Sequence, residues 1–275
     1  MKPELLQQVQ TKQIEIMDVI HSMCVENDIV YYIIGGTALG AVRHGGFIPW
    51  DIDIDIAMPR ADYERFLSLC TERLPRGLTC YSYKCDSHYF PPHALVALDN
   101  SKLIQKNDYL NPRLKRYGIF VDIFPLDVAP EKTVDRKKQA KKISKIRNMK
   151  VRKKGIVYSE NSKSVRLVKK LVSLLYIFVS ENSLNRKLDS CMQQYSNEID
   201  ENSCWCSMAS HYSYEKQCMP KEIYGKPLLV EFAGRKYYAP EKIDEYLRRI
   251  FNDYMKLPDK EQQQYQMDYF VDAEW

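Results

Sequence analysis

Residues 45–60 have the sequence GGFIPWDIDIDIAMPR, in which three isoleucines alternate with three aspartates. This alternation predicts a β-strand, because successive strand side chains point to opposite faces. The glycines and the proline before it mark a turn, and the proline after it predicts the end of the strand. The isoleucines are expected in the core, and Asp51, Asp53 and Asp55 are expected side by side on the opposite face.

The three aspartates predict a metal site. Same-face neighbours on a strand lie about 7 Å apart, so ionised carboxylates repel one another unless a cation lies among them. Oxygen ligands of this kind favour Mg²⁺ or Mn²⁺. Asp122 is a fourth candidate ligand, because it lies in the apolar run GIFVDIF, where an unpaired buried charge would cost several kcal/mol. The alternative is an exposed strand edge on which acids discourage aggregation, and it explains one acid better than three.

A pair of glycines upstream favours phosphate binding. Residues 29–34, IVYYII, predict a buried strand, Gly35 and Gly36 predict a tight turn, and residues 37–43 predict a short helix. Glycines let the backbone approach a ligand, and the first N–H groups of a helix can bind an anion. The pair alone is a weak signal, and a plain turn without a ligand is the alternative.

Glycines before a carboxylate cluster together indicate phosphoryl-type transfer, in which a metal neutralises charge that develops on phosphate. Asp122 could also accept the proton of the attacking hydroxyl. Asp127 is the reserve candidate.

The rest of the chain predicts an α+β fold. We expect a catalytic core at 1–130 with a small mixed sheet, and a mainly helical extension at 131–275 that packs on the core and contributes to the acceptor or donor site. Strands are expected at 94–98 and 119–124, with Pro125 ending the second. Helices are expected at 5–25, 61–70, 132–150, 163–180, 184–196 and 241–255, and a hairpin at 228–238 that turns at Ala233 and Gly234.

Composition favours a globular cytoplasmic protein. The hydrophobic fraction is 45%, the chain starts without an apolar signal-like run, and its longest apolar stretch, 171–179, is far short of a membrane span. Eight cysteines in such a chain are expected to be reduced thiols. The cysteine and histidine groupings at 80–93 and 204–218 lack the paired spacing of a zinc module.

Residues 136–154 carry eleven Lys or Arg and no acid. A solvated helical face and a surface that contacts anionic lipid are two alternative interpretations. Together with the apolar stretch at 171–179, this segment suggests peripheral contact with an anionic membrane. Nucleic-acid binding is not favoured, because the chain has no recognition motif for it.

Residues 31–60, YYIIGGTALGAVRHGGFIPWDIDIDIAMPR, resemble the LicD family, which includes the fukutin-related proteins, within the nucleotidyltransferase-like superfamily. Residues 118–127, GIFVDIFPLD, resemble the family's later catalytic strand. Residues 251–258, FNDYMKLP, resemble its C-terminal Tyr-Met-x-Leu-Pro signature. The resemblance implies a nucleotidyltransferase-like core.

The resemblance implies that Asp53 and Asp55 are catalytic residues that bind the metal, and that Asp122 is the third carboxylate of the catalytic and metal site. The strand pattern adds Asp51 as a further candidate metal ligand. The candidate substrate-binding residues are Gly35, Gly36, Thr37, Arg43, Trp50 and Asp127. The first three would cradle donor phosphates. Arg43 could bind a phosphate through two hydrogen bonds or form a structural salt bridge.

The sequence departs from the family pattern at three positions. Ile52 stands where many bacterial members have aspartate, but strand alternation turns this position away from the acids. Asn252 and Asp259 replace a common glycine and a usual proline. These changes bear on donor or acceptor specificity more than on the chemistry.

The function implied by the resemblance is transfer of a phospho-alcohol, most often phosphocholine from CDP-choline, to a sugar hydroxyl. The acceptor would be a surface glycan such as teichoic acid, lipopolysaccharide or a capsule precursor, or a lipid-linked glycan. Relatives use other CDP-alcohols such as CDP-ribitol. The alternatives are a nucleotidyltransferase that acts on a small molecule or RNA, and an inactive scaffold, against which the retained aspartates argue.

Overall fold

A mixed sheet forms the centre of the computed structural model, which describes all residues except 1, 113, 199–202, 262 and 264–269. The main strand order is β1-β2-β6-β4-β3, and β7 and β8 extend the far end of β6. β2 and β6 are parallel, whereas the other pairs are antiparallel. The strands are β1 (Tyr32–Ile33), β2 (Asp55–Pro59), β3 (Leu78–Tyr81), β4 (Ala94–Leu98), β6 (Phe120–Ala129), β7 (Cys204–Cys206) and β8 (Cys218–Pro220).

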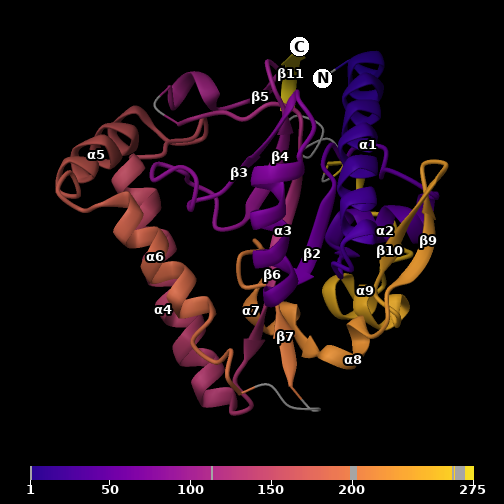
Figure 1. Ribbon diagram of the computed structural model, residues 1–275. Helices are drawn as coiled ribbons and strands as arrows, with labels where there is room; N and C mark the ends of the chain where they lie inside the picture. Colours follow the sequence, from indigo (N-terminus) through magenta and orange to yellow (C-terminus); the bar gives the residue numbers. More distant parts are fainter. Residues whose placement is uncertain (1, 113, 199–202, 262, 264–269) are drawn as a thin grey trace.

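Helices lie on both sides of this sheet, and two small antiparallel pairs, β9–β10 and β5–β11, complete the fold. Figure 1 shows α4, α5 and α6 grouped on one side, and α1, α2 and α9 with the β9–β10 hairpin on the other. The helices are α1 (Pro3–Glu26), α2 (Gly35–His44), α3 (Arg60–Arg73), α4 (Thr133–Lys154), α5 (Lys163–Leu174), α6 (Glu181–Met192), α7 (Tyr214–Gln217), α8 (Lys221–Tyr224) and α9 (Ile243–Phe251). The remaining strands are β5 (Lys102–Gln105), β9 (Leu228–Phe232), β10 (Arg235–Ala239) and β11 (Phe270–Glu274).

The predicted α+β fold is confirmed, and most predicted elements are present. The strand at 94–98 has the predicted bounds, and the hairpin turns at Ala233 and Gly234, whose φ angles of 50° and 76° suit a tight two-residue turn. Strands β3, β5, β7, β8 and β11 were not predicted. The division of the chain near residue 130 stays a prediction. Among the described residues, none of the helices is long and apolar enough to cross a membrane.

The predicted strand of alternating isoleucines and aspartates begins later than expected. Ile52, Ile54 and Ile56 are all buried, as predicted, but β2 starts only at Asp55. The reason lies in α1, where the buried Gln13 amide donates hydrogen bonds to the carbonyls of Ile52 and Phe120, at 2.5 and 3.1 Å. The two chain segments therefore bond to one side chain at this point instead of to each other, which leaves them spread apart.

The prediction that Pro125 ends its strand is wrong, because β6 continues to Ala129. Asp122 donates its N–H to the carbonyl of Ile54, just before β2, and N–H groups alternate sides along a strand, so position 125 faces away from β2. On that side the partners on β4 stop at Ile123, and those on β7 begin only at Asp127. No neighbouring strand needs an N–H from position 125, so proline is tolerated there without the loss of a sheet hydrogen bond.

The predicted helix at 163–180 ends at Leu174. Beyond it, the N–H groups of Leu175, Tyr176 and Ile177 donate to carbonyls three residues back. Such bonds are typical of tight turns at a helix end rather than of a continuing α-helix.

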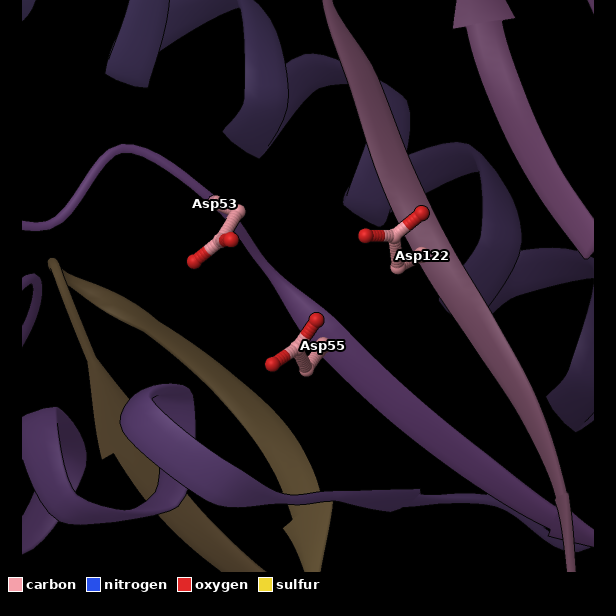
Figure 2. Close-up of side chains that lie close together, drawn as sticks. All are labelled: Asp53, Asp55 and Asp122. Carbon is pink, nitrogen blue, oxygen red and sulfur yellow. The ribbon is translucent and has the colours of Figure 1, made fainter. Parts of the chain in front are cut away.

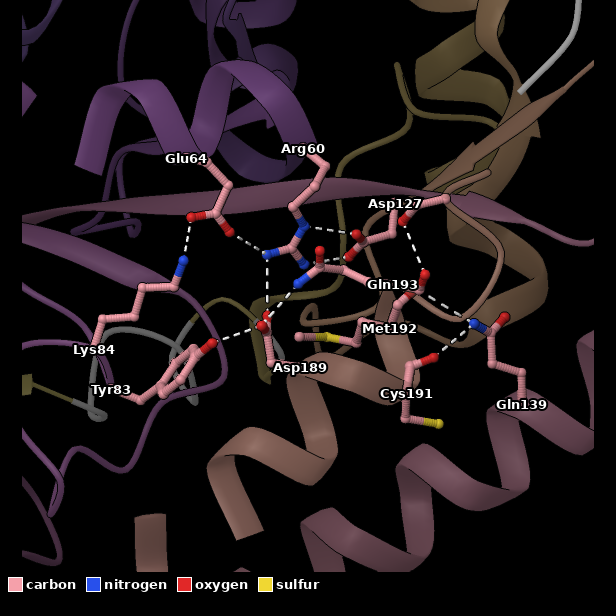
Figure 3. Close-up of polar contacts among 11 residues, drawn as sticks. Arg60, Glu64, Tyr83, Lys84, Asp127, Gln139, Asp189, Cys191, Met192 and Gln193 are labelled. Atoms are coloured by element: carbon pink, nitrogen blue, oxygen red, sulfur yellow. Dashed lines mark hydrogen bonds and ion pairs between the residues drawn. The ribbon is translucent and has the colours of Figure 1, made fainter. Parts of the chain in front are cut away.

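An ion-pair network ties α3, β6 and α6 together (Figure 3). The Arg60 guanidinium donates two hydrogen bonds to the carboxylate of Asp127, at 2.7 and 2.6 Å, and a third, at 3.0 Å, to Asp189. Asp189 also accepts hydrogen bonds from Tyr83 and Gln193. Asp127 is completely buried, so its charge depends on Arg60.

We expect Asp127→Ala to lower the free energy of unfolding by about 3–5 kcal/mol, because it leaves a buried guanidinium without its main partner. Urea denaturation measures this. Lys102→Ala, which breaks the exposed pair with Glu274, is the control and should cost less than about 1 kcal/mol. Equal losses in the two variants would contradict the importance of the buried pair.

Candidate metal centre and its flanking pockets

Three carboxylates from two neighbouring segments converge on one point. Asp53 precedes β2, Asp55 begins it, and Asp122 lies opposite Asp55 in the parallel register of β2 and β6. One oxygen from each side chain lies within 4.8 Å of the others. Figure 2 shows the three carboxylates pointing into the same space between the two segments. These residues form a group that can hold a metal ion.

The electrostatics of the group disfavour three bare negative charges. Burial, and then the neighbouring charges of Asp51 and Asp55, raise the pKa of Asp53 well above its usual range. The pKa of Asp55 is raised by burial and then by Asp122. A cation among the carboxylates would remove this repulsion and restore their ionised forms. A donor set of three carboxylates suits a hard divalent cation.

Asp51 lies beside this group but is not one of its three converging oxygens. Its Oδ1 atom accepts the N–H of Ile52 at 3.1 Å, and its backbone carbonyl accepts a hydrogen bond from Gln10 at 3.0 Å. Burial raises the pKa of Asp51, and a hydrogen bond from Asp53 opposes that rise. Asp51 is thus placed to support Asp53 and to face the neighbouring pocket.

The first turn of α2 packs directly against the aspartates. The predicted glycine turn is not a separate element, because Gly35 and Gly36 are the first residues of α2. The change from strand to helix occurs at Gly35 itself, whose φ of 55° favours glycine. A Cβ on Gly35 would lie 3.2 Å from Asp55 Oδ2, and one on Gly36 would collide with Asp51 Oδ2. The glycines therefore make room for the carboxylates.

Two hydroxyls hold this turn in place. The Thr37 Oγ1 atom accepts the N–H of Asp55 at 2.8 Å, and the Tyr246 hydroxyl accepts the N–H of Gly35 at 2.9 Å. Thr37 thus fixes the start of β2 through its side chain. Tyr246, on α9, is a contributor from the second half of the chain that the sequence did not predict.

A pocket of about 600 Å³ adjoins Asp51 and Gly36. Its walls include four aromatic residues from distant parts of the chain, together with charged groups. They are Trp50, Tyr212, Phe251 and Tyr254, with Arg43, Asp253, Lys256 and Asp259. We call this the aromatic pocket.

Arg43 and Trp50 both line the aromatic pocket, but each also has a structural contact. Arg43 Nη1 donates to the carbonyl oxygens of Tyr254 and Lys256, at 2.8 and 3.4 Å. Arg43 therefore holds in place the segment around these two residues, which lines the pocket. Trp50 packs edge-on against His44, with ring centroids 6.2 Å apart.

A second pocket, of about 370 Å³, adjoins Asp122. Its walls are mostly apolar or aromatic, and they also carry the polar or basic side chains of Gln105, Asn107, Lys115 and Arg116. We call this the basic pocket. The carboxylates therefore lie between two pockets, one reached through Asp51 and the other through Asp122.

His93 is a site residue that the sequence did not identify. Its Nε2 atom lies 3.0 Å from Asp122 Oδ1, and its ring lies over Phe124 with centroids 4.1 Å apart. The other ring nitrogen, Nδ1, is buried and has no hydrogen-bond partner among the described residues. In the sequence, His93 is 29 residues from Asp122, and only the pairing of β4 with β6 brings them together.

Asp127 is not brought to this site. It lies five positions after Asp122 on β6, and its carboxylate accepts hydrogen bonds from Arg60 on the opposite face of the sheet from the group.

A pH- and metal-dependent change in stability should follow from the raised pKa values of Asp53 and Asp55. In the metal-free protein, stabilisation by their protonated forms is complete below about pH 4 and is lost as the pH rises through the folded-state pKa values. We expect thermal melts in EDTA to show lower stability at pH 8 than at pH 5, and Mg²⁺ or Mn²⁺ to reverse the loss at pH 8.

Asp53→Asn removes one charge from the group without changing its shape. The variant should lose less stability between pH 5 and pH 8, gain roughly 2–4 °C in Tm in EDTA at pH 8, and respond less to metal. A metal-induced rise in Tm as large as that of the native protein would show that the cation binds elsewhere.

The chain is similar in sequence to known proteins. Residues 28–142 match a family model described as "LicD/FKTN/FKRP, nucleotidyltransferase domain". The chain is 27% identical over 271 residues to the lipopolysaccharide cholinephosphotransferase LicD of Haemophilus influenzae, which covers 96% of each chain. Short segments of 52 and 48 residues are 44% and 46% identical to uncharacterized proteins of Rickettsia typhi and Rickettsia prowazekii, and cover 17% and 18% of those proteins.

The matched domain contains β1, β2, β4 and β6 and all three converging aspartates. The similarity to the Haemophilus protein extends over the remaining helices and strands as well. Residues 28–142 therefore match the LicD family model, and the similarity to the Haemophilus LicD protein runs along nearly the whole chain.

Proposed function

We propose that this chain is a phosphotransferase that moves phosphocholine from CDP-choline to a sugar hydroxyl of a cell-surface glycan or its lipid-linked precursor. The observation that carries the proposal is the convergence of Asp53, Asp55 and Asp122, with oxygens within 4.8 Å, beside the first turn of α2. The choice of phosphocholine rests on the similarity to a cholinephosphotransferase along 96% of the chain.

The group of three carboxylates would hold Mg²⁺ or Mn²⁺, which supplies charge neutralisation for the phosphates when bound. The first N–H groups of α2, at Gly36 and Thr37, would bind the donor phosphates. Asp122 accepts the proton of the attacking sugar hydroxyl, and His93 holds the Asp122 carboxylate in position.

The two pockets divide the substrates between them. The aromatic pocket receives the CDP-choline, because the faces of Trp50, Tyr212 and Tyr254 suit both a nucleobase and a quaternary ammonium. The basic pocket receives the acceptor glycan, whose hydroxyls and phosphates find amide and cationic partners in Asn107, Lys115 and their neighbours. Residues from both halves of the chain line each pocket, which gives the second half a part in binding substrate.

The enzyme acts in the cytoplasm, in peripheral contact with the anionic inner face of the membrane, where a lipid-linked acceptor would lie. Teichoic acid, lipopolysaccharide and capsule precursors all present suitable hydroxyls. Other CDP-alcohols, such as CDP-ribitol, share the nucleotide and phosphates and would use the same carboxylates.

The test measures products from CDP-choline, Mg²⁺ and a lipid-linked glycan extract. We expect CMP to be released in step with phosphocholine transfer. Asp53→Ala should lower the rate at least about a hundredfold, because the group loses a metal ligand. Asp135→Ala, on the surface of α4, is the matched control and should leave the rate unchanged.

Two outcomes would contradict the proposal. Transfer that survives Asp53→Ala would separate the reaction from the carboxylate group. Release of pyrophosphate from a nucleoside triphosphate, with no CMP from any CDP-alcohol, would instead make the chain a nucleotidyltransferase.

A further inference from the structure

Helix α5 turns its apolar side chains away from the protein. No residue of α5 is buried, and Leu167, Leu171 and Leu174 are 61%, 54% and 59% exposed. Just beyond the helix, Leu175 and Phe178 are 80% and 98% exposed. Figure 1 shows α5 at the outer edge of the molecule, beyond α4. A surface helix normally buries its apolar stripe against the protein core. Because α5 exposes its stripe, this stripe is available to bind a partner outside the chain.

Polar contacts attach the opposite face of α5 to the protein. Arg166 donates to the carbonyl oxygens of Asn161 and Ser159, at 2.8 and 2.6 Å, and Lys169 donates to Asn161 Oδ1 at 2.8 Å. Ser173 lies against Gly155 at the end of α4. These contacts fix the orientation of the helix, so its outward apolar face is built into the fold.

The charges around the apolar stripe are positive. α5 carries four Lys or Arg and no acid, and Lys163 and Lys170 are exposed beside the stripe. Exposed Arg152 lies next to it and donates to the Tyr176 hydroxyl at 3.5 Å. The nearest acid after the helix, Glu181, is paired with Lys154.

We propose that α5 and residues 175–178 form a membrane-docking surface, with the leucines and Phe178 in the acyl boundary of a bilayer and the basic side chains on anionic headgroups. Leucines and a phenylalanine flanked by lysines are the composition of helices that lie in a membrane interface. A second copy of this chain, apposed through the same surface, would bring positive charge against positive charge.

The docking surface is joined to the basic pocket. The segment between α4 and α5 lines that pocket with Ile156 and Tyr158, and Val157 within it exchanges two hydrogen bonds with Asn111. Lys169 of α5 lies 5.2 Å from the centre of the Tyr158 ring. A glycan carried on lipid would therefore reach the pocket beside Asp122. This last step rests on the proposed transferase function, whereas the proposed membrane binding by α5 does not depend on it.

The experiment is flotation of the full chain with vesicles of phosphatidylcholine, with and without phosphatidylglycerol, at low and high salt. We expect binding to the anionic vesicles that weakens with salt. The double variant Leu175→Glu, Phe178→Glu should lower the partition coefficient at least about tenfold, because it places charge in the interface. Leu229→Glu, on the exposed side of β9, is the matched control and should bind normally.

The proposal is overturned if the native protein ignores anionic vesicles, if the double variant binds as well as the control, or if light scattering shows a dimer that the double variant dissolves. Circular dichroism checks that the double variant is folded. A transfer assay separates the two proposals. If the double variant loses transfer to vesicle-bound acceptor but keeps transfer to a water-soluble glycan, the result supports docking. If the native protein is inactive but still floats with the vesicles, only the proposed function is overturned.

Discussion

Repulsion among the carboxylates of Asp53, Asp55 and Asp122 is the constraint on which the rest of this structure depends. The parallel pairing of β2 and β6 sets Asp55 opposite Asp122, and the period of the strand adds Asp53 on the same face. The raised pKa values of Asp53 and Asp55 reflect the free energy that it costs the fold to hold these carboxylates together. A site that is unfavourable without a cation is one that favours binding a cation.

Several unrelated elements serve this arrangement. Gln13 of α1 spreads the segments before β2 and β6, and Gly35 and Gly36 allow α2 to approach the acids. Tyr246 of α9 and His93 before β4 bond to the rim of the site. Because these contacts come from positions throughout the chain, the site is a property of the whole fold, and the pockets on its two sides have walls from both halves.

Features set by local pattern could be predicted from the sequence, whereas features set by pairing could not. The alternation at residues 51–56 predicted the buried isoleucines and the shared face of Asp53 and Asp55, because a period of two needs no partner to be recognised, although Asp51 lies beside the group and not in it. Pro125 predicted a strand end wrongly, since its effect depends on whether a neighbouring strand needs its N–H. His93 was not predicted as a site residue, because only the strand register brings it to Asp122. Helix α5 was predicted, but the sequence alone did not reveal which of its faces is exposed.

The most direct test of metal binding by the three carboxylates is a crystal structure of the protein with Mn²⁺ and CDP-choline, with the metal located by its anomalous scattering. We expect a peak bound by Asp53, Asp55 and Asp122, with the donor phosphates between the metal and the first turn of α2 and the choline in the aromatic pocket. A peak elsewhere, or a nucleotide bound away from these three carboxylates, would contradict the assignment of the metal and donor site.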